Sequence, residues 1–343
     1  MPCCADESLR GQLHMRRKRL AVAGMAMALA AATGGCDALG ESAAPSPGTT
    51  GGGLEKTTVK VAELKIIDAA PIHLAIDNGH FRAEGLNVEL SMGGKGSVNI
   101  DNVIGGTIDI GLSSYPPAIM PVAKKVAELK VVTDAITTTE NLFLLVVKKD
   151  GPIKSIGDLT GRKIAVSSQG GIGELALRTQ LKINGVEITK EQYISMPFAD
   201  MPNALKNDNV HAAIMNEPFL TQTLQNEGVT KLLSPFSGST ANFPTSGWIT
   251  SKKFVDENPK TVAAFQRAMA KGVADAQQRG VVEGAVTKYV GVPPNVASLM
   301  TLPTFPSSTD ATRFQRVVDL MVETGELKPD QRIDMRTMVI DQK

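Results

Sequence analysis

Apolar and polar positions alternate regularly in the part of the chain that begins at Thr57. Over 86–90, apolar residues alternate with Asn87 and Glu89, and this period of two predicts a strand with one buried face. The segment Pro71–Gly79 predicts a helix that ends at its glycine. Similar patterns predict strands over 58–67, 109–112 and 129–133, and a helix over 97–104. Such alternation of strands and helices indicates a mostly parallel sheet covered by helices.

A second block with the same alternation begins near residue 146. Ser155-Ile156-Gly157-Asp158 resembles a capping box before a short helix. The patterns then predict strands over 163–167, 193–197 and 212–215, and helices over 171–184, 201–207 and 218–226. A block of roughly 100 residues is large enough to bury a core of its own. The sequence therefore predicts two α/β units.

The last third of the chain is predicted to be mainly helical. Val262, Phe265 and Met269 recur at helical spacing, and Pro259 suits the first turn of their helix. A second apolar stripe of this kind runs over 314–321. Stripes of Met and Phe at this spacing indicate core packing rather than a cofactor site.

Length, charge and cysteine content restrict the class of protein. A chain of 343 residues favours roughly two domains. Its formal net charge of +1 provides no basic field for nucleic acid. After the N-terminal region, no segment is apolar for long enough to cross a bilayer as a helix. The cysteines are Cys3, Cys4 and Cys36, so later segments have no thiol for a disulfide, a metal or nucleophilic catalysis.

The N-terminus has the features of a secretory signal. Basic residues at 16–19 precede the uncharged apolar run 20–32, which is too short for a stable membrane span. Thr33-Gly34-Gly35-Cys36 then resembles the lipobox of bacterial lipoproteins, in which the cysteine is lipidated, although Thr33 replaces the usual leucine. We expect a signal peptide over 1–35, whose true start is Met1 or Met15, with plain secretion as the alternative to lipidation. Residues 36–56 are rich in Gly, Ser, Ala, Pro and Thr, which predicts a flexible, lipid-anchored linker.

Short motifs follow one another in a fixed order between about 57 and 274. They are PIHLA at 71–75, NGHF at 78–81, EGLNVEL at 84–90, GGTIDIG at 105–111, SIGDLTGRKIAV at 155–166, AL at 204–205, VHAA at 210–213, EP at 217–218, FV at 254–255 and NP at 258–259. Each motif is weak by itself. Their number and order resemble the solute-binding proteins of ABC importers for sulfonates, taurine, nitrate and thiamine pyrimidine precursors.

This resemblance implies an α/β, two-lobed, periplasmic-binding-protein-like fold of type II, with two chain crossovers and a helical C-terminal segment. Lobe 1 would comprise 57–145 and 245–343, and lobe 2 would comprise 146–244. The resemblance also implies a monomer outside the cytoplasm that closes around a small solute and delivers it to an ABC permease and its ATPase. The lipid on Cys36 would hold the protein at the cell membrane. No cofactor, metal or nucleic acid is expected.

Loops at the carboxyl ends of the predicted strands supply the candidate ligand contacts. They contain the following residues: Pro71, His73, Gly94, Ser113, Ser114, Tyr115, Asn141, Ser168, Gly170, Gly171, Glu217 and Trp248. Small hydroxyls beside Tyr115 can hydrogen-bond to a planar ligand while the ring stacks on it. Gly170 and Gly171 lie in a loop that resembles the family's main ligand loop, where amides suit a sulfonate or carboxylate.

Some of these candidates also have an ordinary structural interpretation. His73 lies where the family often has an aromatic residue, and is either a cleft residue or a packed histidine. Glu217 either faces the cleft, which favours a ligand with an amine or ring N–H, or caps a helix dipole. Trp248 either stacks on the ligand or packs the hinge. Lys95, in the loop that contains Gly94, either meets an anion or is solvated.

The residue types favour a binder over an enzyme. Neither G-x-S-x-G nor HExxH is present, and the histidines are scattered. Thiamine pyrimidine synthases resemble these binders in fold, but they carry a cysteine cluster that is absent after Cys36. A ligand sensor that presents its closed form to a membrane receptor is the other alternative. The ligand is either a small sulfonate-like anion at Gly170–Gly171, or a planar nitrogen heterocycle held by Tyr115, Trp248 and Glu217.

Overall fold

The computed structural model describes residues 53–225 and 228–340. The predicted signal peptide, Cys36 and most of the predicted linker lie outside these residues. The end of that linker belongs to the fold, because two charged residues find partners there. Lys56 Nζ lies 2.7 Å from Asp109 Oδ2, and the amide of Thr261 donates to the Glu55 carboxylate at 3.0 Å. The folded part therefore begins before Thr57.

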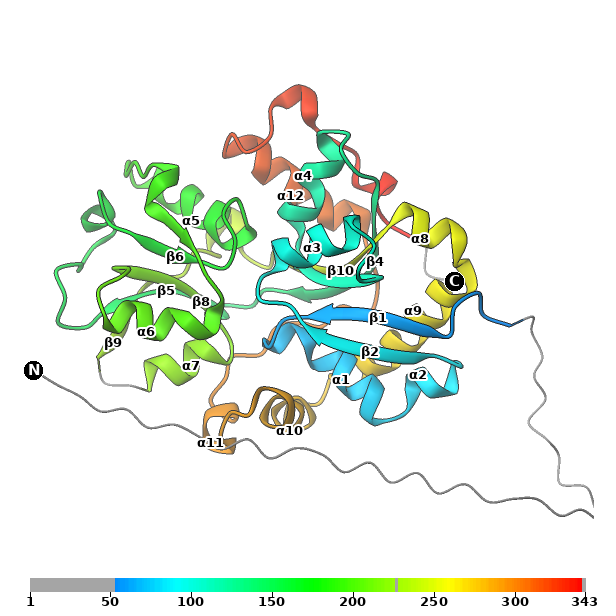
Figure 1. Cartoon of the computed structure of the whole chain (residues 1–343). Helices are drawn as coiled ribbons and strands as arrows, with labels where there is room; N and C mark the ends of the chain where they lie inside the picture. Colours follow the sequence, from blue (N-terminus) through cyan, green and yellow to red (C-terminus); the bar gives the residue numbers. More distant parts are fainter. Residues whose placement is uncertain (1–52, 226–227, 341–343) are drawn as a thin grey trace, which may run out of the picture. The chain divides into compact units, whose positions relative to one another are not determined.

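Two five-stranded sheets form the framework (Figure 1), with strand orders β2-β1-β3-β10-β4 and β7-β6-β8-β5-β9. The first sheet contains β1 (Thr58–Glu63), β2 (Asn87–Met92), β3 (Ile110–Ser114), β4 (Leu129–Thr137) and β10 (Pro244–Ser251). The second contains β5 (Phe143–Lys148), β6 (Ile164–Val166), β7 (Tyr193–Ser195), β8 (Ala212–Asn216) and β9 (Val229–Leu233). We call the parts built on these sheets lobe 1 and lobe 2.

Both sheets are mixed, whereas the sequence patterns predict mostly parallel ones. In lobe 1, β1 is parallel to β2 and β3, while β10 is antiparallel to β3 and β4. In lobe 2, β6 is parallel to β7 and β8, while β5 is antiparallel to β8 and β9. The antiparallel strands β5 and β10 are the ones that follow the two chain crossovers. A strand that enters a sheet directly from the other lobe needs no helical crossover, so it can run against its neighbours.

The crossovers give the lobe boundaries. The chain first passes from lobe 1 to lobe 2 between β4 and β5, and it returns between β9 and β10. The predicted boundary at 146 falls inside β5, so residues 143–145, which were assigned to lobe 1, pair in the second sheet. The return strand β10 begins at Pro244, next to the predicted boundary at 245. The two crossovers and the helical end of the chain match the implied architecture.

Helices flank both sheets (Figure 1). Their bounds are α1 (Ala70–Asp77), α2 (His80–Ala83), α3 (Gly96–Ile104), α4 (Tyr115–Ala123), α5 (Ile172–Ile183), α6 (Met201–Lys206), α7 (Phe219–Leu224), α8 (Lys252–Glu257), α9 (Pro259–Asp275), α10 (Arg279–Val290), α11 (Pro294–Ala297) and α12 (Ala311–Glu323). Within 53–225 and 228–340, none of them has both the length and the apolar character that a membrane crossing requires.

The apolar stripes predicted in the last third are buried, as expected. Val262, Phe265 and Met269 of α9 are each at most 2% exposed, and Pro259 is at the start of that helix. The helix packs against α1. Gly272 makes this approach possible, because a Cβ there would lie 2.2 Å from the carbonyl oxygen of Pro71. The packing of α9 fixes α1, and therefore the turn that precedes it.

Candidate functional site

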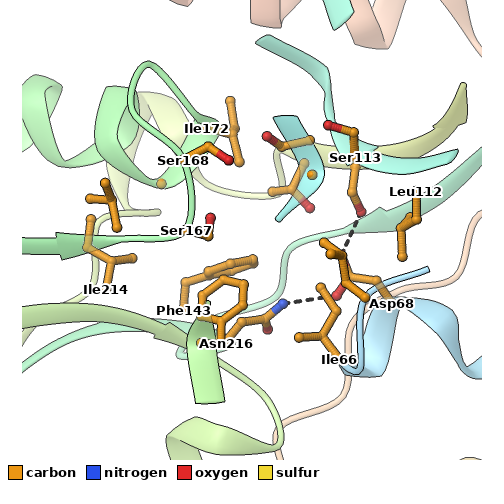
Figure 2. A pocket seen from close by; sticks show the side chains of 18 of the residues that line it. Ile66, Asp68, Leu112, Ser113, Phe143, Ser167, Ser168, Ile172, Ile214 and Asn216 are labelled. Atoms are coloured by element: carbon orange, nitrogen blue, oxygen red, sulfur yellow. Dashed lines mark hydrogen bonds between the residues drawn. The ribbon is translucent and has the colours of Figure 1, made fainter. Parts of the chain in front are cut away.

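A cavity lies between the two lobes, at the carboxyl ends of β1, β3, β6 and β8 and the amino ends of β5 and β10 (Figure 2). The volume of this cavity is about 40 Å³, which is room for a few waters. Lobe 1 lines it with Leu64, Ile66, Asp68, Gly96, Leu112, Ser113, Ser114, Thr245 and Ser246. Lobe 2 lines it with Phe143, Val166, Ser167, Ser168, Ile172, Gly173, Glu174, Phe198, Ile214 and Asn216. This is where open α/β sheets bind ligands.

Asp68 connects the two walls of this cavity. It lies in the 3₁₀ turn η1 (Ile67–Ala69) between β1 and α1, and it is 2% exposed. Its Oδ1 accepts a hydrogen bond from Asn216 Nδ2 at 2.9 Å, and its Oδ2 accepts one from Ser246 Oγ at 2.6 Å (Figure 2). Desolvation by burial raises the pKa of Asp68 to about 6, although both hydrogen bonds favour the ionised form. The carboxylate is therefore mostly ionised at pH 7.

Small hydroxyl side chains form the rest of the polar lining. Ser113 and Thr245 are at most 1% exposed, and neither hydroxyl has a hydrogen-bond partner among the described residues. Across the cavity, Ser168 Oγ of lobe 2 donates to Ser97 Oγ of lobe 1 at 3.4 Å. A buried hydroxyl without a partner costs free energy until something bonds to it. The hydroxyls of Ser113 and Thr245 are therefore available to a bound molecule.

Glycine at position 96 brings the first turn of α3 against the third strand. A Cβ at this position would lie 2.8 Å from Ser113 Oγ and 3.1 Å from Ser113 Cα. Because only a residue without a Cβ fits there, the glycine-rich loop after β2 shapes the cavity wall through Gly96. Gly94, which the sequence analysis selected from the same loop, is exposed and does not line the cavity.

Glu174 is the second carboxylate of the lining. It lies in the first turn of α5, is 3% exposed, and accepts a hydrogen bond from the amide of Gly170 at 2.8 Å. Burial raises its pKa, while the Gly170 bond and the charge of Arg178 oppose that rise. Arg178 Nη1 lies 3.6 Å from Glu174 Oε1. Glu174 therefore has a cation within one helical turn.

The remaining lining is apolar and includes two aromatic rings. Phe143 from β5 and Phe198 from the turn after β7 belong to lobe 2, and both are at most 9% exposed. Aliphatic side chains complete the surface, from Leu64, Ile66, Leu112, Val166, Ile172 and Ile214. An apolar cavity with a few polar groups is typical of small-molecule sites, because the apolar surface provides affinity and the polar groups provide orientation.

Three of the residues that we selected from the sequence lie on the cavity wall. Ser113 and Ser114 follow one another at the end of β3, and Ser168 lies in the loop after β6. That loop continues into Gly170 and Gly171. Gly170 has a φ of 65°, and its amide is bonded to Glu174, while Gly171 is the N-cap of α5. Neither glycine lines the cavity.

Tyr115 and Trp248 are core residues of lobe 1 rather than cavity residues. Both are fully buried. Tyr115 is the first residue of α4, packs against Phe314 at 4.7 Å between ring centroids, and donates its hydroxyl to Asp134 Oδ1 at 2.6 Å. Trp248 lies in β10 within the apolar core. The cavity wall is formed instead by residues that precede them in the chain, Ser114 before Tyr115, and Thr245 and Ser246 before Trp248.

Pro71 and His73 belong to α1 but do not reach the cavity. Pro71 is buried in the first turn of the helix. His73 Nε2 is 2.7 Å from Glu63 Oε2, and its ring stacks on Tyr289 at 3.9 Å between centroids. The packed-histidine interpretation therefore describes the position of His73. The tyrosine hydroxyl donates to the carbonyl of Ile66 at 2.8 Å, so this group supports the turn that contains Asp68.

Glu217 lies between β8 and α7 of lobe 2, and Asn141 lies in the first crossover. Glu217 is buried, and it accepts hydrogen bonds from the amide and hydroxyl of Thr221 at 3.0 and 2.8 Å and from the amide of Thr301 at 3.1 Å. This is the helix-capping interpretation, because Thr221 is in the first turn of α7. Asn141 has a φ of 64° in the first crossover, and its side chain accepts a hydrogen bond from Lys231 at 2.6 Å. Neither residue lines the cavity.

Sequence reasoning did not select Asp68, Asn216, Ser246 and Phe143, which are central to the cavity. A signal for Asp68 existed, because an acidic residue between a predicted strand and a predicted helix is at the usual place for ligand contacts. Asn216 similarly follows directly after the strand predicted over 212–215. Ser246 and Phe143 lie in β10 and β5, the crossover strands that the sequence patterns did not predict.

Comparison with known proteins identifies the family to which this chain belongs. The family model described as NMT1/THI5 like matches residues 66–279, which is more than half of the chain. The chain belongs to the NMT1/THI5-like family. Among curated members and relatives, the riboflavin-binding protein RibY of Chloroflexus aurantiacus is 25% identical over 68% of this chain and 66% of its own length. The nitrate/nitrite binding protein NrtA of a Nostoc species is 25% identical over 77% of this chain and 66% of its own length.

These two alignments therefore span just under two thirds of each curated relative. A solved structure, that of the periplasmic aliphatic sulphonate binding protein SsuA from Escherichia coli, superposes with a TM-score of 0.63 at 20% identity. The superposition covers 82% of this chain and 97% of SsuA. At this identity the likeness concerns the fold, which is that of the periplasmic binding proteins. The three proteins are named for the binding of riboflavin, nitrate or nitrite, and aliphatic sulphonates, so their names do not agree on one class of ligand.

Proposed function

We propose that this chain is the solute-binding component of an ABC importer, and that it holds a small organic solute in the cavity between its lobes. The observation that carries this proposal is the composition of the wall. Asp68 of lobe 1 is bonded to Asn216 of lobe 2 across the cavity, and hydroxyls from both lobes face the same space. Rotation of one lobe against the other would open these contacts and admit the solute. The family and the fold support this function.

The cavity lining favours binding over catalysis. The described residues that line it provide hydroxyls, an amide, two carboxylates and apolar groups, and they include no His or Cys. Within the described part of the chain, no cluster of three or more His, Cys, Asp or Glu has metal-site geometry. Ser246 Oγ donates to the Asp68 carboxylate at 2.6 Å, but the described lining residues include no third group, such as a histidine, that would orient this pair for acyl or group transfer.

The site of action that we propose is the outer face of the cell membrane. Signal cleavage before Cys36 and lipidation of its thiol would anchor the chain, and residues 37–52 would serve as the leash. The anchored protein would bind its solute as a monomer and deliver it to a permease and its ATPase. The sulfonate-like anion and the planar nitrogen heterocycle both remain ligand classes under this function.

The test of this function is native mass spectrometry of the freshly purified protein, together with small-angle X-ray scattering. We expect a small molecule to travel with the protein, and its removal to increase the radius of gyration. Ser168→Phe, which fills the cavity, should abolish retention of the molecule. Ser298→Phe, at an exposed position of the C-terminal part, is the matched control and should retain it. Retention by the Ser168 variant, or no change in the radius of gyration, would contradict the proposal.

A further inference from the structure

The two carboxylates of the cavity differ in how their charge is compensated. Glu174 has Arg178 within 3.6 Å. Among residues 53–225 and 228–340, the side chains that bond to Asp68 are neutral, namely the amide of Asn216 and the hydroxyl of Ser246. A buried charge without a counter-ion is costly, and proteins usually pair such charges or bond them to a ligand. Asp68 is therefore an acceptor that lacks its cation in the ligand-free protein.

The lining provides no cation that would attract an anion. None of the described residues that face the cavity is Lys, Arg or His. Lys95 is adjacent to Gly96 in the chain, but it is not a lining residue. The amide of Gly170, before the N-terminus of α5, is already bonded to Glu174. An anionic solute would therefore enter a cavity that already contains two acidic groups, and only one of them is paired with an arginine.

The unused hydrogen-bonding capacity next to Asp68 indicates where a solute would bind. Each carboxylate oxygen of Asp68 accepts one side-chain hydrogen bond and has capacity for another. The unpartnered hydroxyls of Ser113 and Thr245 belong to the same lobe and line the same space. Phe143 and Ile66 contribute apolar surface to the same cavity (Figure 2). A flat, largely apolar body with N–H donors at one end matches these features.

We propose that the solute carries a cationic or N–H-rich nitrogen group that Asp68 accepts, and that simple anions such as nitrate and sulfonates are excluded. The inference rests on the proposed function and selects between its two ligand classes. An amidinium, a protonated amine on a ring or an aminated heterocycle satisfies it. A planar amidinium presents two parallel N–H groups to a carboxylate, which is the strongest form of this interaction.

The test uses an isosteric pair of opposite charge, benzamidinium and benzoate, with methanesulfonate and nitrate as further anions. Isothermal titration calorimetry on the solute-stripped protein at pH 7.5 should show benzamidinium binding at least about tenfold more tightly than any of the anions. Asp68→Asn should remove this preference by weakening benzamidinium binding at least about tenfold. Asp330→Asn, which makes the same change at an exposed position outside the cavity, is the matched control and should retain the preference.

The wild-type charge comparison does not depend on the folding of a variant. Equal or tighter binding of an anion, no binding of benzamidinium, or benzamidinium binding that survives Asp68→Asn overturns the inference. An anion that binds and compacts the protein overturns only the inference and leaves the proposed function intact. A chain that retains no solute in native mass spectra and compacts with no probe contradicts the proposed function itself.

Discussion

At the scale of single residues, burial and the choice of partner decide what each acidic group does. Asp68, Asp134 and Glu174 are all nearly fully buried. Asp134 bonds to the Tyr115 hydroxyl and pairs with Arg313 at 2.5 Å, which ties α12 to the first sheet. Glu174 has Arg178 beside it. Asp68 has a raised pKa and no cation, and this combination in a cavity is typical of functional groups.

The raised pKa of Asp68 predicts pH-dependent binding. Its pKa is about 6 in the folded protein, against an ordinary value of 3.8, so the carboxylate becomes protonated as the pH falls through 6. A cationic probe needs the ionised form. We therefore expect benzamidinium affinity to be roughly tenfold lower at pH 5 than at pH 7.5. Calorimetry across this range measures the effect, and Asp68→Asn should show a flat profile.

A control variant distinguishes the titration of Asp68 from that of other ionisable groups near it. Three ionisable side chains lie together beside the start of α1, namely Glu63, His73 and Tyr289. Burial raises the pKa of Tyr289, and the negative charges of Glu63 and Asp68 raise it further. His73→Asn should leave the pH profile of binding unchanged. The sign for stability is opposite to that for binding. The folded pKa of Asp68 is above its ordinary value, so ionisation destabilises the ligand-free protein increasingly from pH 4 to pH 6. If the pH dependence of binding persists in Asp68→Asn, or disappears in His73→Asn, then a group other than Asp68 causes it.

At the scale of elements, α5 and the segment after α12 connect the two lobes. Arg178 of α5 pairs with Glu326 at 3.1 Å and donates to the carbonyl of Thr324. Lys190 of lobe 2 also lies 3.1 Å from Glu326. The helix α12 packs against α4 and β10 of lobe 1. Arg178 is also the cation beside Glu174, so one side chain joins the cavity wall to the contact between lobes.

Removal of this contact should weaken closure. We expect Arg178→Gln to lower benzamidinium affinity by about three- to tenfold, because a partly buried ion pair contributes more than an exposed one. The bound form should also have a larger radius of gyration in solution scattering. Lys253→Gln, which breaks an exposed pair with Glu257 in α8, is the matched control and should change neither quantity. Wild-type affinity and compaction in Arg178→Gln would show that this contact does not stabilise the closed form.

At the scale of the whole molecule, the cavity depends on segments that are distant in sequence. The Asp68–Asn216 bond spans 148 residues and the Asp68–Ser246 bond spans 178. The amide of Ile67 also donates to the carbonyl of Glu217 at 3.1 Å, beside the same bonds. The Asp68–Asn216 and Ile67–Glu217 bonds join the two lobes, whereas the Asp68–Ser246 bond lies within lobe 1. A movement of the lobes would therefore change the cavity and the first two bonds together.

At the same scale, we predict that lipidation of Cys36 attaches the protein to the membrane. Cys36→Ser in the full-length precursor should prevent lipidation, because the hydroxyl cannot replace the thiol that receives the lipid. The variant should appear in the soluble extracytoplasmic fraction, whereas the wild type should sediment with membranes and incorporate labelled fatty acid. Cys3→Ser is the matched control and should behave as the wild type. Membrane attachment of the Cys36 variant with unchanged labelling would contradict the prediction.

The sequence by itself determined the local elements and the order of the architecture. Period-two alternation placed β2, and helical spacing after Pro259 placed α9, because these patterns follow from the geometry of one segment. The ordered motifs pointed to two lobes with two crossovers. The hydroxyls at Ser113, Ser114 and Ser168 were also found from local position, since each follows a predicted strand end. These features depend on neighbours in sequence, so they can be recognised without the fold.

Only the tertiary structure decided which side chains share the cavity. Local position treats Ser113, Tyr115 and Trp248 alike, but core packing buries the two aromatic rings in lobe 1 and leaves Ser113 on the cavity wall. The antiparallel insertion of β5 and β10 brings Phe143 and Ser246 to the same space. The charge state of Asp68 follows from burial by segments more than a hundred residues away. No local pattern contains these long-range contacts, and they set the chemistry of the site.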